Sequence, residues 1–470
     1  MSNVITRFAP SPTGMLHLGN VRTALLNWLY ARKHDGQFRL RFEDTDRDRS
    51  EAKYIKAIQE DITWLGLGWD GDVLFQSAHA DKHAEALEKL ADQGLAYRCF
   101  CTEHQLALDR KLATSRGLPP RYHGRCRLLS TADSDVRVRS EPYVWRLAVH
   151  RDDAGAGSAE VIVHDVLRGD VHFHSRDLDD PVIVRSDGTF TFLLPNAVDD
   201  AVDGITHVLR GDDHLTNSAY QVWLLERLGY APPAYLHHGL LLGEDGSKLS
   251  KRTGSYSIAE LRGQGLLPAA LVQVMARLGH PNMPDDVTSV HALAGCFEAE
   301  HVSTSSVKWV DGEMWRWHAR LLHALPPEEM ALLIRSHVPE TDTARLQAFA
   351  ALIGGNLQRA EDAAGFVCLL DADAETGADA TAIIREAGAD FYNCALKAWQ
   401  KAEKATDGPE WKAWTADVKA QTGRKGKGLF LPLRAALTGA LHGPEMSEVV
   451  SFLGADGVTS RLKKVIGRIS

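Results

Sequence analysis

The stretch from Val4 to Lys33 constrains the fold more than any other part of the chain. It begins with a short apolar run that predicts a strand, continues through the turn sequence Pro10–Gly14, and ends in a predicted helix. One face of that helix is apolar, because apolar residues recur at helical spacing, at Val21, Ala24, Leu25, Trp28 and Leu29. The start of a helix offers free N–H groups and a positive dipole end, both of which suit phosphate. His17 and Gly19 lie at this start, where the glycine permits close approach of a ligand and the imidazole can donate to a phosphoryl oxygen.

Length and composition limit the classes of protein that remain. A chain of 470 residues predicts about three domains. Its hydrophobic fraction of 44% and charged fraction of 24% are typical of globular proteins. The sequence has no run of 18 apolar residues and no basic region followed by an apolar one at its start, which favours the cytoplasm and no membrane contact. Six cysteines are too few for a disulfide scaffold of this size.

An HxG triplet alone is weak evidence for a nucleotide site, but its flanks here are specific. The full stretch RFAPSPTGMLHLGNVRTALLNWLYAR resembles the HIGH region of class I aminoacyl-tRNA synthetases, and in particular the glutamyl-tRNA synthetases. The resemblance implies a Rossmann-type catalytic domain that binds ATP with Mg²⁺. Asn20 departs from the general class signature, which has a second histidine, although the glutamyl branch commonly lacks it. The ATP-binding residues that the resemblance implies are Pro10, Ser11, Thr13, His17, Gly19, Asn20 and Lys251.

Four further segments are similar to the same family: FEDTD at 42–46, RSDGT at 185–189, VDD at 198–200 and GITHVLRGDDHLTNS at 204–218. The resemblance implies a glutamate site formed by Arg7, Ala9, Ser11, Glu43, Phe192, Asn196 and Arg210. In that site Glu43 would hold the α-amino group. Two arginines in one pocket suit a substrate with two carboxylates, because guanidinium pairs with carboxylate in a bidentate way. Phe192 departs from the family, which usually has a tyrosine that reaches the substrate side chain.

The segment Gly243–Gly254, with the spelling KLSKR, resembles the mobile KMSKS loop of the same class. Lysines there supply positive charge to the triphosphate, and Lys251 would stabilise the leaving pyrophosphate. The catalytic residues that we predict are His17, Lys248 and Lys251. A plain surface turn is the alternative for such a loop taken by itself.

The pattern of the chain predicts an α/β catalytic domain with an α+β insertion, followed by helical regions, and the resemblance implies that the insertion binds the tRNA acceptor end. The predicted strands Tyr143–Leu147, Glu160–Val163 and Val171–His174 are assigned to the insertion, and no strand is predicted after about residue 240. The predicted domains are the first catalytic half at 1–96, the insertion at 97–182, the second catalytic half at 183–255, a stem-contact helical domain at 256–325 and an all-helical anticodon-binding domain at 326–470.

The charge is unevenly distributed along the chain. The net charge is −9, but residues 411–470 hold ten basic and four acidic residues. A basic end on an acidic body suits a partner with a phosphate backbone. The segments TGRKGKGLF at 422–430 and PLR at 432–434 resemble the anticodon-binding domain of the family, which implies tRNA contacts through Arg424, Lys425, Lys427 and Arg434. A solvated charged helix face is the alternative.

Three cysteines early in the predicted insertion are candidates for a structural zinc site. Thiolates are preferred ligands of zinc in such sites, and Cys99, Cys101 and Cys126 would need a fourth ligand, either Tyr122 or His123. The arrangement with Tyr122 resembles the zinc site of the short glutamyl-queuosine paralogs. Buried thiols without a metal are the alternative.

The sequence therefore predicts a glutamate–tRNA ligase that forms glutamyl-adenylate from glutamate and ATP. It would then transfer the glutamyl group to the 3′-terminal adenosine of tRNA(Glu), and charging of tRNA(Gln) stays open; we expect a monomer. A glutamyl-queuosine-type paralog would end near residue 300, and a small-molecule nucleotidyltransferase would not need the basic helical end. A non-enzymatic tRNA-binding protein would have lost His17, Lys248 and Lys251, which are present.

Overall fold

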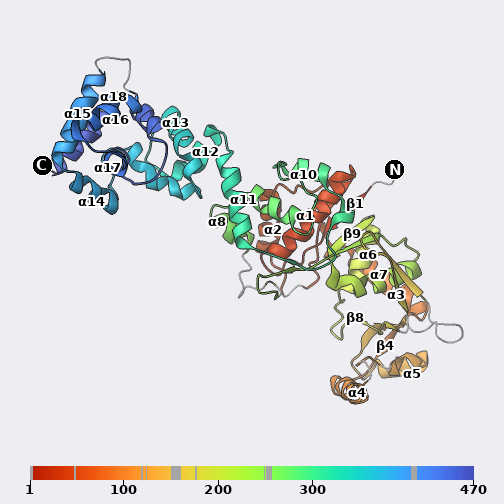
Figure 1. Ribbon diagram of the computed structural model, residues 1–470. Helices are drawn as coiled ribbons and strands as arrows, with labels where there is room; N and C mark the ends of the chain where they lie inside the picture. The colour runs from red at the N-terminus through yellow and green to blue at the C-terminus, as the bar shows by residue number, and fades with distance from the viewer. Residues whose placement is uncertain are drawn as a thin grey trace. The chain divides into compact units, whose positions relative to one another are not determined.

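The computed structural model describes residues 4–46, 49–117, 120–122, 124–149, 160–174, 177–247, 249, 257–403 and 410–469. Lys248, Lys251 and His123 lie outside the described residues. The chain divides into two compact units, Met1–Gln264 with Leu271–Asp311, and Gly265–Ala270 with Gly312–Ser470 (Figure 1).

The first unit begins with a parallel three-stranded sheet in the order β1-β2-β3, formed by β1 (Ile5–Phe8), β2 (Gln37–Phe42) and β3 (Leu74–Phe75). The helix α1 (Leu18–Lys33) connects β1 to β2, and α2 (Ala52–Trp64) connects β2 to β3. The predicted apolar positions of α1 are all buried, because the helix packs against its own sheet. Gly36 is required where the chain re-enters the sheet, since a Cβ there would lie 2.2 Å from the carbonyl oxygen of Val4.

A second sheet has the order β7-β6-β10-β9 and comprises β6 (Glu160–Asp165), β7 (Gly169–His174), β9 (His207–Gly211) and β10 (Ala234–His238). Strands β6, β10 and β9 are parallel, and β7 is an antiparallel edge strand. The backbone N–H of Thr206 donates to the carbonyl of Ile5, so that β9 begins beside β1. The helices α6 (Leu193–Val202) and α7 (Leu215–Leu228) pack together, and α7 is buried along most of its length.

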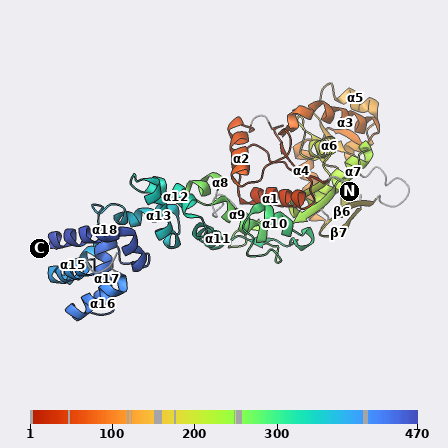
Figure 2. The ribbon, with the colours of Figure 1, turned by 90° about the horizontal axis from the view of Figure 1, so that it is seen from above.

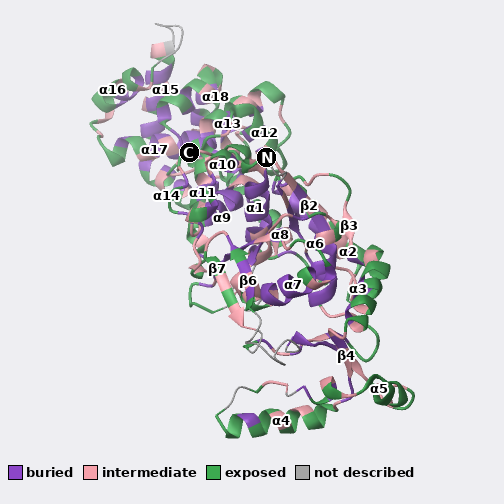
Figure 3. Cartoon of the chain, turned by 90° about the vertical axis from the view of Figure 1, so that its right-hand side faces the viewer, coloured by how far each residue is buried: buried purple, intermediate pink, exposed green. Residues whose placement is uncertain are grey.

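A third, antiparallel sheet has the order β4-β5-β8, with β4 (Ala96–Cys99), β5 (Val144–Leu147) and β8 (Val182–Val184). The helices α4 (Glu103–Ser115) and α5 (Thr131–Arg137) lie in the same part of the chain, and α4 is largely exposed (Figure 3). Only one of the three strands predicted for the insertion, β5, lies in this sheet. The β6–β7 hairpin pairs with β10 instead, and alternation within a hairpin cannot reveal which sheet it joins.

The first unit also contains α3 (Ala80–Asp92), α8 (Ile258–Gly263), α10 (Val290–Cys296) and a parallel pair, β11 (Leu241–Leu242) with β12 (Val307–Lys308). The helix α9 (Pro268–Arg277) begins in the second unit and ends in the first. The prediction that no strand follows about residue 240 is therefore wrong. Two residues per strand are too few for a period-two pattern to be recognised.

Among its described residues after Gly312, the second unit contains helices joined by loops and no strand. Its main helices are α11 (Asp311–His323), α12 (Pro327–Ile334), α13 (Thr343–Ile353), α14 (Ala378–Ala387), α15 (Ala389–Glu403), α16 (Trp411–Thr422), α17 (Lys427–Thr438) and α18 (Met446–Ile469). The helices α15 to α18 lie together around a core that includes Tyr392, Trp399 and Trp414 (Figure 2). None of the described helices combines the length and the apolar character that a membrane span requires.

Candidate active site

A cavity of about 480 Å³ opens at the carboxyl ends of β1, β9 and β10. This edge of a parallel sheet is where α/β folds bind ligands, because the loops that follow the strands diverge there. The strands contribute Arg7, Arg210 and His238, and the beginning of α1 forms another wall. The structure thus brings together segments that lie more than 200 residues apart in the sequence.

Most of the residues predicted to bind ATP or glutamate line this cavity. They are Arg7, Ala9, Pro10, Ser11, His17, Gly19, Asn20, Glu43, Phe192, Asn196 and Arg210. Thr13 is not among the lining residues; its backbone N–H donates to the carbonyl of Ser11 within the turn. Lys248 and Lys251 belong to the part of the chain that the structure does not describe.

The start of α1 presents polar groups to the cavity. A Cβ on Gly19 would lie only 3.3 Å from the His17 ring, so glycine allows the imidazole to lie close to the first turn. The backbone N–H of His17 donates to the side-chain oxygen of Asn20. Burial lowers the pKa of His17, which favours the neutral imidazole. A neutral imidazole carries one N–H donor that can face a phosphoryl oxygen.

The described residues on either side of 250–256 lie at or near the same cavity. Leu249 lines it, and Ser257 pairs with His17 in an isolated antiparallel bridge. The backbone N–H of Ile258 donates to the carbonyl of Leu16 next to this bridge. Sequence positions on both sides of residues 250–256 are therefore held near the start of α1.

Arg7 is held by a carboxylate behind the cavity wall. Its Nε and Nη2 donate to the two oxygens of Asp200, at 3.0 and 3.2 Å. Asp200 also accepts from Arg41 Nη2 at 2.7 Å, and Arg41 Nη1 donates to Asp203 at 2.9 Å. Burial opposes ionisation of Asp200, but the charges of Arg7 and Arg41 prevail and lower its pKa. The charge of Arg7 is thus largely compensated before any ligand binds.

Arg210 differs from Arg7, because it has no ion pair with the described residues. Its Nη2 donates to Ser218 Oγ at 2.6 Å and to Gln221 Oε1 at 2.5 Å, and both are neutral acceptors. Its Nε and Nη1 are buried and have no hydrogen-bond partner in the part of the chain that the structure describes. Burial lowers the pKa of Arg210 to about 10, so the side chain stays charged at neutral pH. A carboxylate in the cavity would meet an uncompensated guanidinium.

Glu43 and Asn196 form the adjoining part of the wall. Asn196 Nδ2 donates to Glu43 Oε1, and Asn196 Oδ1 accepts from Gln221 at 2.7 Å. Burial raises the pKa of Glu43, while the charge of Arg41 and the hydrogen bond from Asn196 oppose the rise. Phe192 lies beside His214, with ring centroids 5.3 Å apart, and offers no hydroxyl to a ligand. Recognition by hydrogen bonds therefore depends on the surrounding polar groups.

Another cavity residue, Arg22 on α1, was not predicted from the sequence. It is 1% exposed, and none of its guanidinium nitrogens has a hydrogen-bond partner among the residues that the structure describes. Burial lowers the pKa of Arg22 to about 10. The pKa of the neighbouring His238 is also lowered, mainly by its own burial and then by the charge of Arg22. The sequence placed Arg22 in the predicted helix next to the apolar residue Val21. It did not show whether the arginine side chain turns toward a cavity or toward solvent.

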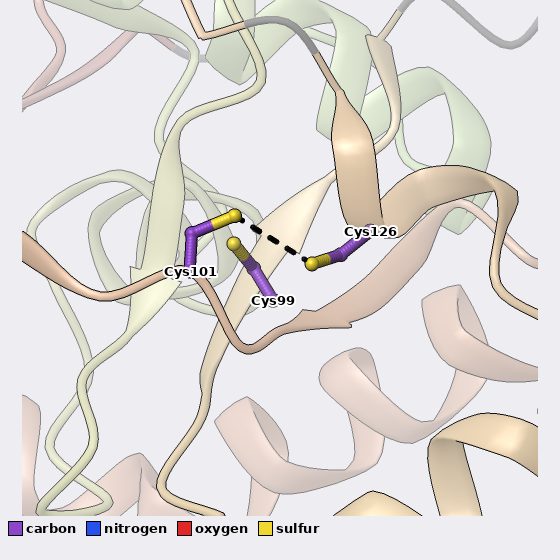
Figure 4. Close-up of side chains that lie close together, drawn as sticks. All are labelled: Cys99, Cys101 and Cys126. Atoms are coloured by element: carbon purple, nitrogen blue, oxygen red, sulfur yellow. Dashed lines mark hydrogen bonds between the residues drawn. The ribbon is translucent and has the colours of Figure 1, made fainter. Parts of the chain in front are cut away.

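The three candidate zinc ligands from cysteine lie together, with sulfur atoms within 4.8 Å of one another (Figure 4). Cys101 Sγ and Cys126 Sγ are 3.7 Å apart. The Tyr122 hydroxyl oxygen lies 3.3 Å from Cys99 Sγ and 3.8 Å from Cys101 Sγ. Tyr122 therefore belongs to the same cluster. His123 is outside the described residues.

The four residues predicted to contact tRNA divide into two kinds. Lys425, in the loop after α16, and Lys427, the first residue of α17, are both exposed. Arg424 donates to the carbonyl of Ala387 and lies over the Phe391 ring, and Arg434 donates to the carbonyl of Pro444. The two arginines are half-buried and already hold backbone carbonyls in place. The two lysines are the more accessible of the four to a phosphate.

Comparison with known proteins agrees with these features. Residues 3–316 match the family of tRNA synthetases class I (E and Q), catalytic domain, and residues 318–466 match an anticodon binding domain. Glutamate–tRNA ligase 2 of Dinoroseobacter shibae is 40% identical over 95% of this chain and 98% of its own, and glutamate–tRNA ligase 2 of Sphingopyxis alaskensis is 39% identical over 99% of both. A solved glutamate tRNA ligase from Elizabethkingia meningosepticum covers both chains completely with a TM-score of 0.84 and 25% identity.

These matches confirm the predicted class I catalytic fold and the helical anticodon-binding region that follows it. They also confirm the resemblance based on the HIGH-like and KMSKS-like segments, and they extend it over nearly the whole chain. The chain therefore belongs to the family of class I glutamyl-tRNA synthetases, or glutamate–tRNA ligases, and is an aminoacyl-tRNA ligase.

Proposed function

We propose that this protein activates L-glutamate with Mg·ATP to glutamyl-adenylate and then transfers the glutamyl group to the 3′-terminal adenosine of tRNA(Glu). The choice of glutamate as the amino acid rests on Arg210. Its guanidinium is buried, has two nitrogens without a partner among the described residues, and lies in one cavity with Arg7. A neutral side chain in this place would leave that charge desolvated and unpaired, which favours a dicarboxylic amino acid. The full-length relatives carry the name of the same activity.

The activation step needs positioning and charge stabilisation rather than a covalent nucleophile. The α-carboxylate of glutamate attacks the α-phosphorus in line, and pyrophosphate leaves with the negative charge. His17, Lys248 and Lys251 would stabilise that charge, while Pro10, Ser11, Gly19 and Asn20 border the ATP. Magnesium would accompany ATP and neutralise part of its phosphate charge. Glu43 would bind the α-amino group, and Arg7 and Arg210 the carboxylates.

The remaining parts of the chain are proposed to hold tRNA. The segment 97–182 would contact the acceptor end, 256–325 the stem, and 326–470 the anticodon arm. Lys425 and Lys427 support the last assignment, because both are exposed within a basic segment. We propose that the enzyme acts as a monomer in the cytoplasm, where tRNA is charged.

Glutamylation of separate tRNA(Glu) and tRNA(Gln) transcripts, with ATP and radiolabelled glutamate, tests this function. We expect tRNA(Glu) to be charged, with the label sensitive to mild base as an aminoacyl ester requires. Charging of tRNA(Gln) as well would make a second, amide-forming enzyme necessary for Gln-tRNA. If neither transcript accepts glutamate, the catalytic proposal is wrong and a non-enzymatic tRNA-binding role returns.

We also propose that Cys99, Cys101, Tyr122 and Cys126 hold one structural zinc ion. In a tetrahedral site with Zn–S bonds of about 2.3 Å, sulfur atoms lie about 3.8 Å apart. The distance of 3.7 Å between Cys101 and Cys126 fits this geometry, and so does the Tyr122 hydroxyl beside two of the thiols. Interaction with Cys126, and then with Tyr122, lowers the pKa of Cys99, which favours a thiolate there. Bound zinc would join β4 to the segment around Cys126.

Metal analysis of the purified protein tests the zinc proposal. We expect about one zinc per chain in the wild type and a strong loss in Cys99→Ser, because a serine hydroxyl is a poor replacement for thiolate. Cys296→Ser is the matched control, since Cys296 lies outside the cluster, and it should keep its zinc. A wild-type protein that contains no zinc after expression in zinc-supplemented medium would contradict the proposal.

A further inference from the structure

We propose that Asp165, His237 and Ser218 form a positioning chain for Arg210, which holds its guanidinium so that the terminal nitrogen Nη1 faces the side-chain carboxylate of the substrate. This inference rests on the proposed function, because it assumes that Arg210 meets glutamate. None of the three residues was singled out in the sequence. They come from three different elements, β6, β10 and α7.

The chain starts at Asp165, whose carboxylate accepts four hydrogen bonds. One oxygen accepts from the backbone N–H groups of Leu167 and Arg168, at 2.8 and 3.0 Å. The other lies 3.0 Å from the backbone nitrogen of His237 and 2.6 Å from its Nδ1. The backbone N–H groups of Leu167, Arg168 and His237 can only donate, so the carboxylate of Asp165 accepts from all three, as an ionised carboxylate does. Burial opposes this state, but the hydrogen bond from His237 lowers the pKa of Asp165.

An ionised Asp165 determines the tautomer of His237. Nδ1 must carry a proton in order to donate to the carboxylate. Burial is the main cause that lowers the pKa of His237, so the ring is neutral and Nε2 carries no proton. The Nε2 atom lies 2.6 Å from Ser218 Oγ, and it can therefore only accept. The hydroxyl hydrogen of Ser218 consequently points to His237, at 2.6 Å, rather than to the carbonyl of His214, at 3.3 Å.

This direction leaves the oxygen lone pairs of Ser218 for Arg210. Arg210 Nη2 donates one hydrogen to Ser218 Oγ and the other to Gln221 Oε1. Gln221 is itself oriented, because its Nε2 donates to Asn196 Oδ1 and Asn196 donates to Glu43. Both hydrogens of Nη2 are thus assigned to fixed acceptors. Among the described residues, the donors without partners are then those of Nε and Nη1, and the terminal nitrogen Nη1 is the one left for a carboxylate.

A serine, a histidine and an aspartate in line could also suggest a hydrolytic triad. The burial argues against it, since Ser218 and His237 are 0% exposed and Asp165 is 4% exposed. The oxygen of Ser218 also accepts from a guanidinium, which lowers its electron density and blocks its approach to a carbonyl. The arrangement is therefore suited to orienting a charged side chain in a rigid wall, as catalytic sites require of their supporting residues.

The Ser218→Ala variant tests this positioning chain. Its activity is measured by steady-state ATP–pyrophosphate exchange in the presence of tRNA. Removing one acceptor of a charged donor should raise the KM for glutamate about tenfold or more, while the KM for ATP stays within about twofold. Ser218→Thr keeps the hydroxyl and should restore much of the affinity. Tyr220→Phe is the matched control on α7, because it removes a buried hydroxyl that accepts from the backbone of Asp179 and does not touch Arg210. We expect its glutamate KM to be unchanged.

Two variants of His237 distinguish a role in positioning Arg210 from a role in packing the core. The amide nitrogen of His237→Asn can occupy the place of Nδ1, so it keeps the bond to Asp165 and loses the acceptor for Ser218. His237→Gln can instead place its amide oxygen near Nε2 and keep that acceptor. We expect the asparagine variant to raise the glutamate KM more than the glutamine variant does, at similar melting temperatures.

The outcomes distinguish this inference from the function on which it rests. If the wild type does not activate glutamate, the proposed function fails before any variant is compared. If the wild type is active and Ser218→Ala keeps the wild-type KM for glutamate, only the positioning chain is wrong. Equal rises in both KM values, together with a lower melting temperature, would indicate a packing role and would also overturn it.

Discussion

Arg210→Leu should reduce kcat/KM for glutamate about 10³-fold, which corresponds to about 4 kcal/mol of lost transition-state binding. The reason is that Arg210 has only neutral partners among the described residues, and its unpaired Nη1 would pair with the substrate carboxylate. Arg7 cannot substitute for it, because two of its nitrogens already bind Asp200. ATP–pyrophosphate exchange in the presence of tRNA measures this loss.

Arg210→Lys provides the matched comparison, because it keeps the charge but not the planar fork. We expect an intermediate loss, since an ammonium cannot bind Ser218, Gln221 and a carboxylate in the same geometry. Thermal melting checks that both variants are folded. A leucine variant that is folded and has a normal glutamate KM would show that the side-chain carboxylate is bound elsewhere.

Arg41→Met should lower the free energy of unfolding of the first unit by about 3–5 kcal/mol, because it removes the cation shared by buried carboxylates. Arg41 is fully buried and donates to Asp200 and Asp203, and its Nε lies 3.9 Å from Asp199. Methionine has a similar length but no charge. Urea unfolding, followed by circular dichroism and by activity, measures the change.

Arg32→Met is the control for this variant, because it removes another arginine that binds an aspartate through two nitrogens. The pair of Arg32 and Asp70 is partly exposed, so its loss should cost no more than about 1 kcal/mol. Equal destabilisation by the two variants would contradict the assigned importance of the buried cluster around Arg41.

The pH dependence of this cluster has a definite sign. The pKa of Asp200 is lowered in the folded protein, so its contribution to stability is present above the ordinary value of 3.8 and is lost as the pH falls through the lowered value. Arg41→Met removes one of the two cations that lower this pKa. The stability difference between the wild type and Arg41→Met should therefore shrink when unfolding is measured at strongly acidic pH.

Sequence patterns predicted those elements of the fold that are determined by residues close together in the chain. The helix α1 was predicted close to its observed bounds, because its apolar spacing and the preceding turn act within a few residues. The sheet that the β6–β7 hairpin joins was not predictable in this way. Its partner β10 lies about 70 residues further along the chain, and only packing decides between two sheets.

The sequence by itself determined the family, a mostly helical second half and many of the polar residues around the cavity, because contiguous motifs specify them. The tertiary structure decided which of the two arginines keeps an uncompensated charge. That outcome depends on Asp200 beside Arg7 and on Ser218 and Gln221 beside Arg210, and hydrogen bonds across separate elements leave no periodic trace in a sequence.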